Sequence, residues 1–119
     1  MSTLTGRRVL IAEDELLVGL DIKATLQRVG CDVFGPFAKL RDAATALTLQ
    51  RPDAAVLDIN LAGEKVFPLA DALARKGVPF LFVTAYSNTW IPHEYRNRTI
   101  VAKPFFTPVI IGAIGGLLR

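Results

Sequence analysis

Short apolar runs alternate with longer amphipathic stretches along the chain. Five short runs consist mostly of apolar residues, which is typical of strands buried on both faces of a parallel sheet. They are residues 9–12, 32–35, 54–57, 79–83 and 99–102. Gly35 and Pro36 are expected to end the second of them.

Amphipathic stretches between these runs predict three helices. In the first, Val18, Ile22, Leu26 and Val29 recur at steps of four, four and three, and Gly30 is well placed to end it. A second helix is expected from residue 40 to before residue 52, and a third over residues 66–76. Residues 87–98 contain a proline and little periodicity, so any helix there is expected to be short or irregular.

The alternation of strands and helices predicts one α/β domain over residues 1–119, a typical domain length. Its sheet would be parallel, with helices on both faces. In such sheets ligands bind beyond the carboxyl ends of the strands. The polar residues that follow each strand are therefore the candidates for function.

The composition limits the cellular compartment and the classes of binding partner that we expect. The 14 Lys and Arg exceed the 11 Asp and Glu and give a net charge of +3. The basic residues are dispersed along the chain, so nucleic-acid binding is not expected. Cys31 is the single cysteine, which excludes an intrachain disulfide and a thiolate metal cluster. No run approaches the roughly 20 apolar residues of a membrane span, and the first residues lack a signal-peptide pattern. We therefore expect a cytoplasmic chain with no membrane contact.

Five polar residues stand at the strand ends. Glu13 and Asp14 follow the first strand, Asp58 the third, Thr84 the fourth and Lys103 the fifth. Three carboxylates this close would repel, and Mg²⁺ with its preference for oxygen ligands would relieve the repulsion. A carboxylate can accept a phosphoryl group, whose oxygens a hydroxyl and an ammonium could hold. The pattern predicts Mg²⁺-dependent phosphoryl transfer.

The sequence resembles the receiver domains of two-component response regulators. Four motifs in order carry the resemblance: residues 9–15 (VLIAEDE), 57–61 (LDINL), 83–85 (VTA) and 103–105 (KPF). It extends over essentially the whole chain. It implies a flavodoxin-like, doubly wound sheet of five parallel strands in the order 2-1-3-4-5.

The resemblance also implies roles for individual residues. Asp58 would accept the phosphoryl group from a histidine kinase or a histidine phosphotransfer protein. Asp14 would contact Mg²⁺ directly and Glu13 through water, with Asp58 and the backbone carbonyl of Asn60 as further ligands. After phosphorylation, Thr84 would bind one phosphoryl oxygen and Lys103 would pair with another. The peptide bond between Lys103 and Pro104 would be cis.

Three features depart from the family pattern. Ile100 stands where the family often has a switching aromatic residue, so the usual relay from Thr84 is in doubt. Residues 59–64 lack the common Met-Pro pair, so that loop could differ. Pro92 interrupts the fourth helical region, which places the chain nearer a divergent receiver branch of stand-alone or kinase-attached domains.

Residues 109–118 carry no charged or polar side chain. Gly112, Gly115 and Gly116 would each cost a helix about 1 kcal/mol against alanine. One interpretation of the tail is a weakly formed terminal helix or a segment of a longer chain. The other is a face for a second copy, a partner or a further domain.

We expect a phosphorylation-controlled switch, not an enzyme, that signals to an unidentified output protein by contact. Two alternatives remain: a receiver-like module that binds without phosphate, and a receiver segment of a hybrid sensor kinase. A Mg²⁺-dependent phosphatase is disfavoured, because such enzymes carry Asp-x-Asp after the first strand, where this chain has Glu-Asp-Glu.

Overall fold

A parallel sheet forms the centre of the molecule. The computed structural model describes residues 4–85 and 90–119. Five strands make the sheet: β1 (Arg8–Ala12), β2 (Asp32–Phe37), β3 (Ala54–Asp58), β6 (Phe80–Thr84) and β7 (Ile100–Ala102). Their order is β2-β1-β3-β6-β7, with every neighbouring pair parallel. The predicted 2-1-3-4-5 order of the five main strands is confirmed.

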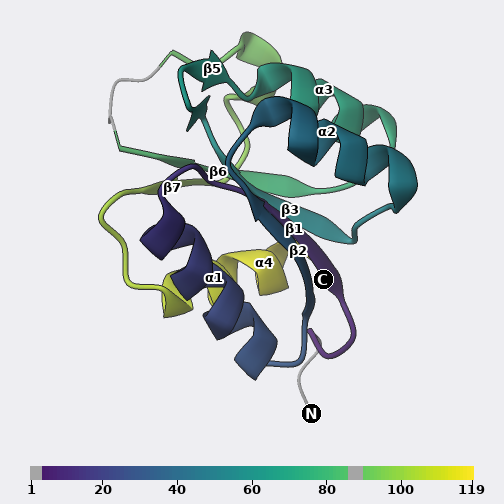
Figure 1. Cartoon of the computed structure of the whole chain (residues 1–119), viewed down its shortest axis with the longest axis vertical. Helices are drawn as coiled ribbons and strands as arrows, with labels where there is room; N and C mark the ends of the chain where they lie inside the picture. Colours follow the sequence, from purple (N-terminus) through teal and green to yellow (C-terminus); the bar gives the residue numbers. More distant parts are fainter. Residues whose placement is uncertain (1–3, 86–89) are drawn as a thin grey trace.

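Helices cover both faces of the sheet, as predicted (Figure 1). Helices α1 (Leu16–Arg28) and α4 (Pro108–Leu117) lie on one face, and α2 (Leu40–Leu49) and α3 (Phe67–Arg75) lie on the other. Successive residues of β1 point to opposite faces, so Val9 and Ile11 join one hydrophobic core while Leu10 joins the other. Both cores hold the strands in register, and the register brings the carboxyl ends of the strands together.

Strand β2 is longer than predicted. It passes through a cis peptide bond between Gly35 and Pro36 and continues to Phe37, which pairs with Ala12 after an irregularity in register. The carbonyl oxygen of Phe37 then accepts a hydrogen bond of 2.9 Å from the N–H of Glu13. The prediction that the strand ends at Gly35 was wrong because pairing with β1 resumes beyond the proline.

A small hairpin was not predicted. Strands β4 (Asn60–Leu61) and β5 (Glu64–Lys65) pair antiparallel and are joined by Ala62 and Gly63. Both joining residues have positive φ, 49° and 87°, as the two central residues of a type I′ turn do. The usual sequence signal for this turn is Asn-Gly or Asp-Gly, and alanine in its first position conceals it.

In the described part of the segment between β6 and β7, regular structure is scarce, as predicted; residues 86–89 lie outside the described residues. Within its described part, the 3-10 helix η1 (His93–Tyr95) is the regular element. Tyr95 is buried against Phe80 and Phe82, and its hydroxyl donates a hydrogen bond to Asp71 on α3. This one aromatic side chain therefore anchors η1 to the core.

The apolar tail forms a regular helix, α4, and much of it belongs to the core. Ile110, Ile114 and Gly115 are buried, and the helix packs against α1 and β6. Its apolar character is thus partly explained by burial within the chain. Val109 remains half exposed, so an interface with a second copy stays a prediction.

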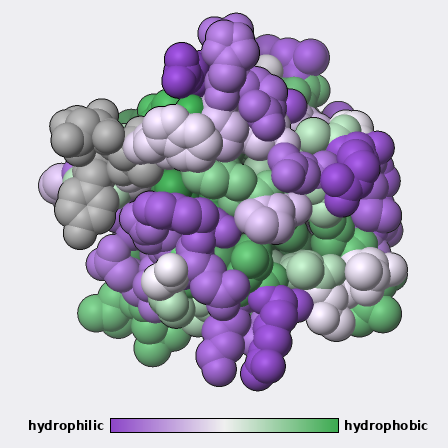
Figure 2. All heavy atoms as spheres, turned by 90° about the horizontal axis from the view of Figure 1, so that it is seen from above, coloured by the Kyte–Doolittle hydropathy of each residue, from purple (hydrophilic) through white to green (hydrophobic). Residues whose placement is uncertain are grey.

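The surface mixes hydrophilic and hydrophobic residues. In the view from above, hydrophobic residues show in the middle of that face and at parts of its lower rim, with hydrophilic residues between and around them (Figure 2). Of the helices in the described ranges, none is both long and apolar enough to cross a membrane.

Gly19 on α1 allows close packing against β2, and this gives a testable prediction. A Cβ at Gly19 would lie 2.7 Å from the Cβ of Pro36, whereas a Cβ at Gly112 on α4 would meet nothing within 4 Å. We expect Gly19→Ala to lower the free energy of unfolding by about 1–3 kcal/mol through overpacking. Gly112→Ala should raise it by about 1 kcal/mol through helix propensity. Urea unfolding of both variants checks the contrast, and a stabilising Gly19→Ala would contradict the packing.

Candidate functional site: a carboxylate and lysine cluster

The parallel sheet brings the predicted site residues to one edge. Glu13 and Asp14 follow β1, Asp58 ends β3, Thr84 ends β6, and Lys103 follows β7. These four strands are consecutive neighbours, so their carboxyl ends lie side by side. Residues from four distant parts of the sequence therefore meet in one cluster.

Lys103 is the cation at the centre of this cluster. Its Nζ lies 2.8 Å from Oε1 of Glu13, 2.6 Å from Oε1 of Glu15 and 3.2 Å from Oδ2 of Asp58. The contacts with Glu15 and Asp58 have hydrogen-bond geometry. The contact with Glu13 does not, and Oε1 of Glu13 is a buried side-chain oxygen without a hydrogen bond in the described residues. The single ammonium group of Lys103 thus forms ion pairs with three carboxylates.

The three carboxylates differ sharply in burial. The side chains of Glu13 and Asp58 are 1% and 9% exposed, while that of Glu15 is 57% exposed. The Glu13 side chain is also fixed by the backbone, because its Oε2 accepts a hydrogen bond of 3.0 Å from the N–H of Glu15. Two of the acids are therefore fixed in the protein, and the third can reach water.

This crowding raises the pKa of Asp58. Burial is the largest cause, followed by the hydrogen bond and the charge repulsion with Glu13; Lys103 opposes them, and the pKa reaches about 8. For Lys103, burial alone would lower the pKa. The close contacts with the carboxylates of Glu13, Glu15 and Asp58 outweigh it and raise the pKa above its usual value. Without a further cation the site holds more negative charge than Lys103 can balance.

Asp14 lies at the exposed side of the cluster. Its Oδ2 accepts a hydrogen bond of 3.1 Å from the N–H of Ala62, in the turn of the β4–β5 hairpin. Desolvation by itself would raise the pKa of Asp14, but this backbone bond and the hydrogen bonds with Asp58 and Glu13 lower it overall. The hairpin therefore favours the ionised form of Asp14.

Asn60 lies between Asp58 and the hairpin. Its N–H donates to Oδ1 of Asp58 at 3.4 Å, and its side-chain oxygen accepts a hydrogen bond of 2.7 Å from Lys65. Asn60 also lines a cavity of about 170 Å³ that opens onto the acids. The other lining residues are Asp14, Glu15, Asp58, Ala85 and Lys103. Its placement is compatible with the predicted carbonyl ligand, which stays a prediction.

The chemistry of the acidic side chains fits a hard divalent cation. Glu13, Asp14 and Asp58 each offer a carboxylate oxygen, and the three oxygens lie within 4.8 Å of one another. Mg²⁺ takes oxygen ligands and usually retains several waters, for which the adjoining cavity has room. A cation here would also offset the repulsion that raises the pKa of Asp58.

Thr84 and Lys103 are joined through the backbone. The N–H of Lys103 donates a hydrogen bond of 2.8 Å to the carbonyl oxygen of Thr84, and the peptide bond between Lys103 and Pro104 is cis. Thr84 is buried at the end of β6. Ile100, at the position of the often aromatic residue, is 41% exposed on the edge strand β7.

Two contributors were not predicted. Glu15 was not among the predicted site residues, but it is the N-cap residue of α1 and its side chain reaches Lys103. Ala62 contributes a backbone N–H, which no side-chain pattern can reveal. The run of three acids at residues 13–15 was the available signal for Glu15.

Comparisons with known proteins agree with this architecture. No protein-family model matches the chain. The transcriptional regulatory protein PdtaR of Mycobacterium tuberculosis is 30% identical over 112 residues, covering 91% of this chain and 55% of PdtaR. The chain thus spans about half the length of the curated relatives it matches.

Two solved structures match along most of their length. SdrG from Sphingomonas melonis Fr1 is 34% identical with a TM-score of 0.83, and the match covers 100% of both chains. The REC domain of the response regulator PhyR from Erythrobacter litoralis is 28% identical with a TM-score of 0.84, covering 98% of this chain and 93% of that one. The fold and the sequence thus agree, and the chain belongs to the receiver domains of response regulators.

Proposed function

We propose that this receiver domain is a phosphorylation-controlled switch that accepts a phosphoryl group on Asp58. The observation that carries the proposal is the geometry around this side chain. A largely buried carboxylate lies 3.2 Å from an ammonium and beside two further acids, at the carboxyl end of a parallel sheet. A cavity of about 170 Å³, which has room for a small group, opens onto it.

Four oxygen donors would hold Mg²⁺. Asp14 and Asp58 would be direct ligands, Glu13 would act through water, and the carbonyl of Asn60 would complete the protein ligands. When bound, Mg²⁺ would neutralise part of the negative charge on the carboxylates and on the incoming phosphoryl oxygens. The proposal is supported by the excess of carboxylates over the charge of Lys103.

The chain's own residues would perform the transfer as follows. An ionised oxygen of Asp58 attacks the phosphorus of a phosphohistidine on a kinase or phosphotransfer protein. The P–O bond to Asp58 forms, the P–N bond breaks, and the imidazole nitrogen keeps the electron pair and takes a proton. Lys103 and the hydroxyl of Thr84 each bind a phosphoryl oxygen, which stabilises the charge during transfer.

The resulting acyl phosphate would bias two conformations of the domain. It adds negative charge and acceptor oxygens that Lys103 and Thr84 bind in one state only. Output would then be contact with another protein or with another part of the same polypeptide, as in a hybrid kinase. Since Ile100 replaces the usual aromatic residue, the relay from Thr84 needs another route.

The test is intact mass spectrometry after incubation with acetyl phosphate, with and without Mg²⁺. We expect a gain of one phosphoryl group that requires Mg²⁺ and is absent in Asp58→Asn. A second incubation with a phosphohistidine protein extends the test to the natural donor class. If neither donor adds a phosphoryl group, the domain is a binding module that works without phosphate.

A further inference from the structure

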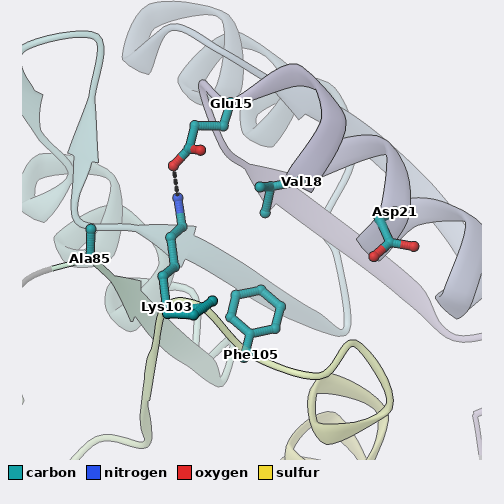
Figure 3. A pocket seen from close by; sticks show the side chains of 7 residues that line it. Glu15, Val18, Asp21, Ala85, Lys103 and Phe105 are labelled. Atoms are coloured by element: carbon teal, nitrogen blue, oxygen red, sulfur yellow. Dashed lines mark hydrogen bonds and ion pairs between the residues drawn. The ribbon is translucent and has the colours of Figure 1, made fainter.

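Glu15 makes a contact that the proposed function does not use. It is the N-cap residue of α1, a position that favours Ser, Thr, Asp or Asn. Its side chain makes no capping hydrogen bond. Instead it extends toward Lys103, and the two charged groups face each other across the gap between α1 and β7 (Figure 3).

This pair stands between two cavities. Glu15, Ala85 and Lys103 line both the 170 Å³ cavity above Asp58 and a second cavity of about 460 Å³. The second cavity lies between α1 and the residues after β7, and its further lining residues are Val18, Asp21, Pro104 and Phe105 (Figure 3). The Glu15–Lys103 contact therefore forms part of the wall between the acceptor site and a larger, mainly apolar hollow.

The ammonium of Lys103 has three protons and three carboxylate neighbours. Lys103 donates two of these protons in hydrogen bonds, to Glu15 and Asp58. Oε1 of Glu13 lies 2.8 Å from Nζ without hydrogen-bond geometry. A phosphoryl oxygen that binds the ammonium is therefore repelled by three nearby carboxylates, and it binds more closely when one of them moves away. Glu13 is 1% exposed and held by the N–H of Glu15, and Asp58 carries the phosphoryl group itself. Glu15 is 57% exposed, so its carboxylate can turn into water at little cost.

We propose that Glu15 is a positioning residue that competes with the phosphoryl group for Lys103 and is released when Asp58 is phosphorylated. This deepens the proposed function and rests on it. In the unphosphorylated domain the pair holds Lys103 toward α1. In the phosphorylated domain Lys103 turns to the phosphoryl oxygen, and the freed Glu15 opens the wall between the two cavities. The change reaches α1 and the hollow without an aromatic residue at position 100.

The test is the effect of Glu15→Gln on binding of trifluoroberyllate, a phosphoryl analogue, and on the rate of phosphorylation by acetyl phosphate at saturating Mg²⁺. We expect the affinity for the analogue and the rate at low donor concentration to rise about 2–5-fold, the size expected for losing a half-exposed ion pair. The donor concentration at half-maximal rate should fall more than the maximal rate changes. A purely structural role of Glu15 would instead leave these values unchanged or worsen them.

Asp21→Asn is the matched control. Asp21 lines the same cavity as Glu15, and its Oδ2 accepts a hydrogen bond of 2.6 Å from the hydroxyl of Thr107, so asparagine removes a charge there without altering the neighbours of Lys103. Glu15→Ala should reproduce the gain. An equal gain in Asp21→Asn, or none in Glu15→Gln, would overturn the inference. A wild-type protein that takes no phosphoryl group would instead refute the proposed function, and the inference with it.

Discussion

Replacing Lys103 by methionine is expected to lower the free energy of unfolding of the metal-free protein by about 2–4 kcal/mol at neutral pH. The ammonium is within 3.2 Å of three carboxylates, two of them almost fully buried. Removing one partner of a buried ion pair leaves the other charge uncompensated, which costs more than the pair itself contributes. Methionine keeps the length of the side chain, so the loss reports the charge. Urea unfolding in EDTA measures it.

Two comparisons make this prediction specific. Lys76→Met removes an exposed lysine after α3 and should change the free energy of unfolding by less than about 0.5 kcal/mol. In the Lys103→Met background, Asp58→Asn should recover part of the loss, because one of the unbalanced carboxylates is gone. A loss in Lys103→Met no larger than in Lys76→Met would contradict the described ion pairs.

Asp58→Asn is expected to stabilise the metal-free protein, by about 1–3 kcal/mol at pH 8. The folded-state pKa of Asp58 is raised from 3.8 to about 8, first by burial and then by Glu13. The folded state therefore binds a proton that the unfolded state releases near pH 4. The stability that this proton contributes is complete below about pH 4 and is lost as the pH rises to about 8. Asparagine does not ionise, so the variant should not lose this stability as the pH rises.

The measurement is urea unfolding of wild type and Asp58→Asn in EDTA from pH 5 to pH 8. The wild type should lose stability across this window, and the variant should lose much less. The raised pKa of Lys103 changes the stability only above pH 10.5, and the lowered pKa of Asp14 changes it only below pH 3.8. Neither effect falls between pH 5 and pH 8. Mg²⁺ should stabilise the wild type more than the variant. Parallel pH curves would contradict a raised pKa.

The sheet and the position of the site could be predicted from the sequence for a physical reason. Strands buried on both faces are short apolar runs, so they are visible without knowledge of their neighbours. Parallel strands end at one edge, so residues as far apart as Glu13 and Lys103 were expected to meet. The proline and the lack of periodicity predicted that any helix around Pro92 would be short or irregular, and η1 is such a helix.

Other features depend on contacts that the local sequence does not encode. Glu15 and Lys103 are 88 residues apart, and the side-chain type alone cannot tell a helix-terminal acid from an ion-pair partner. The β4–β5 hairpin turns at Ala62, where alanine gives no turn signal. The apolar pattern of α4 was ambiguous because burial within the chain and an interface select the same residues.

The most direct test of the central claim is to identify the residue that carries the phosphoryl group. Borohydride reduces an aspartyl phosphate to homoserine, and peptide mass spectrometry then locates it. After incubation with acetyl phosphate and Mg²⁺, the account predicts homoserine at position 58 and at no other acid of the cluster. Modification at Glu13 or Asp14 instead, or unmodified peptides even after incubation with a phosphohistidine protein, would contradict it.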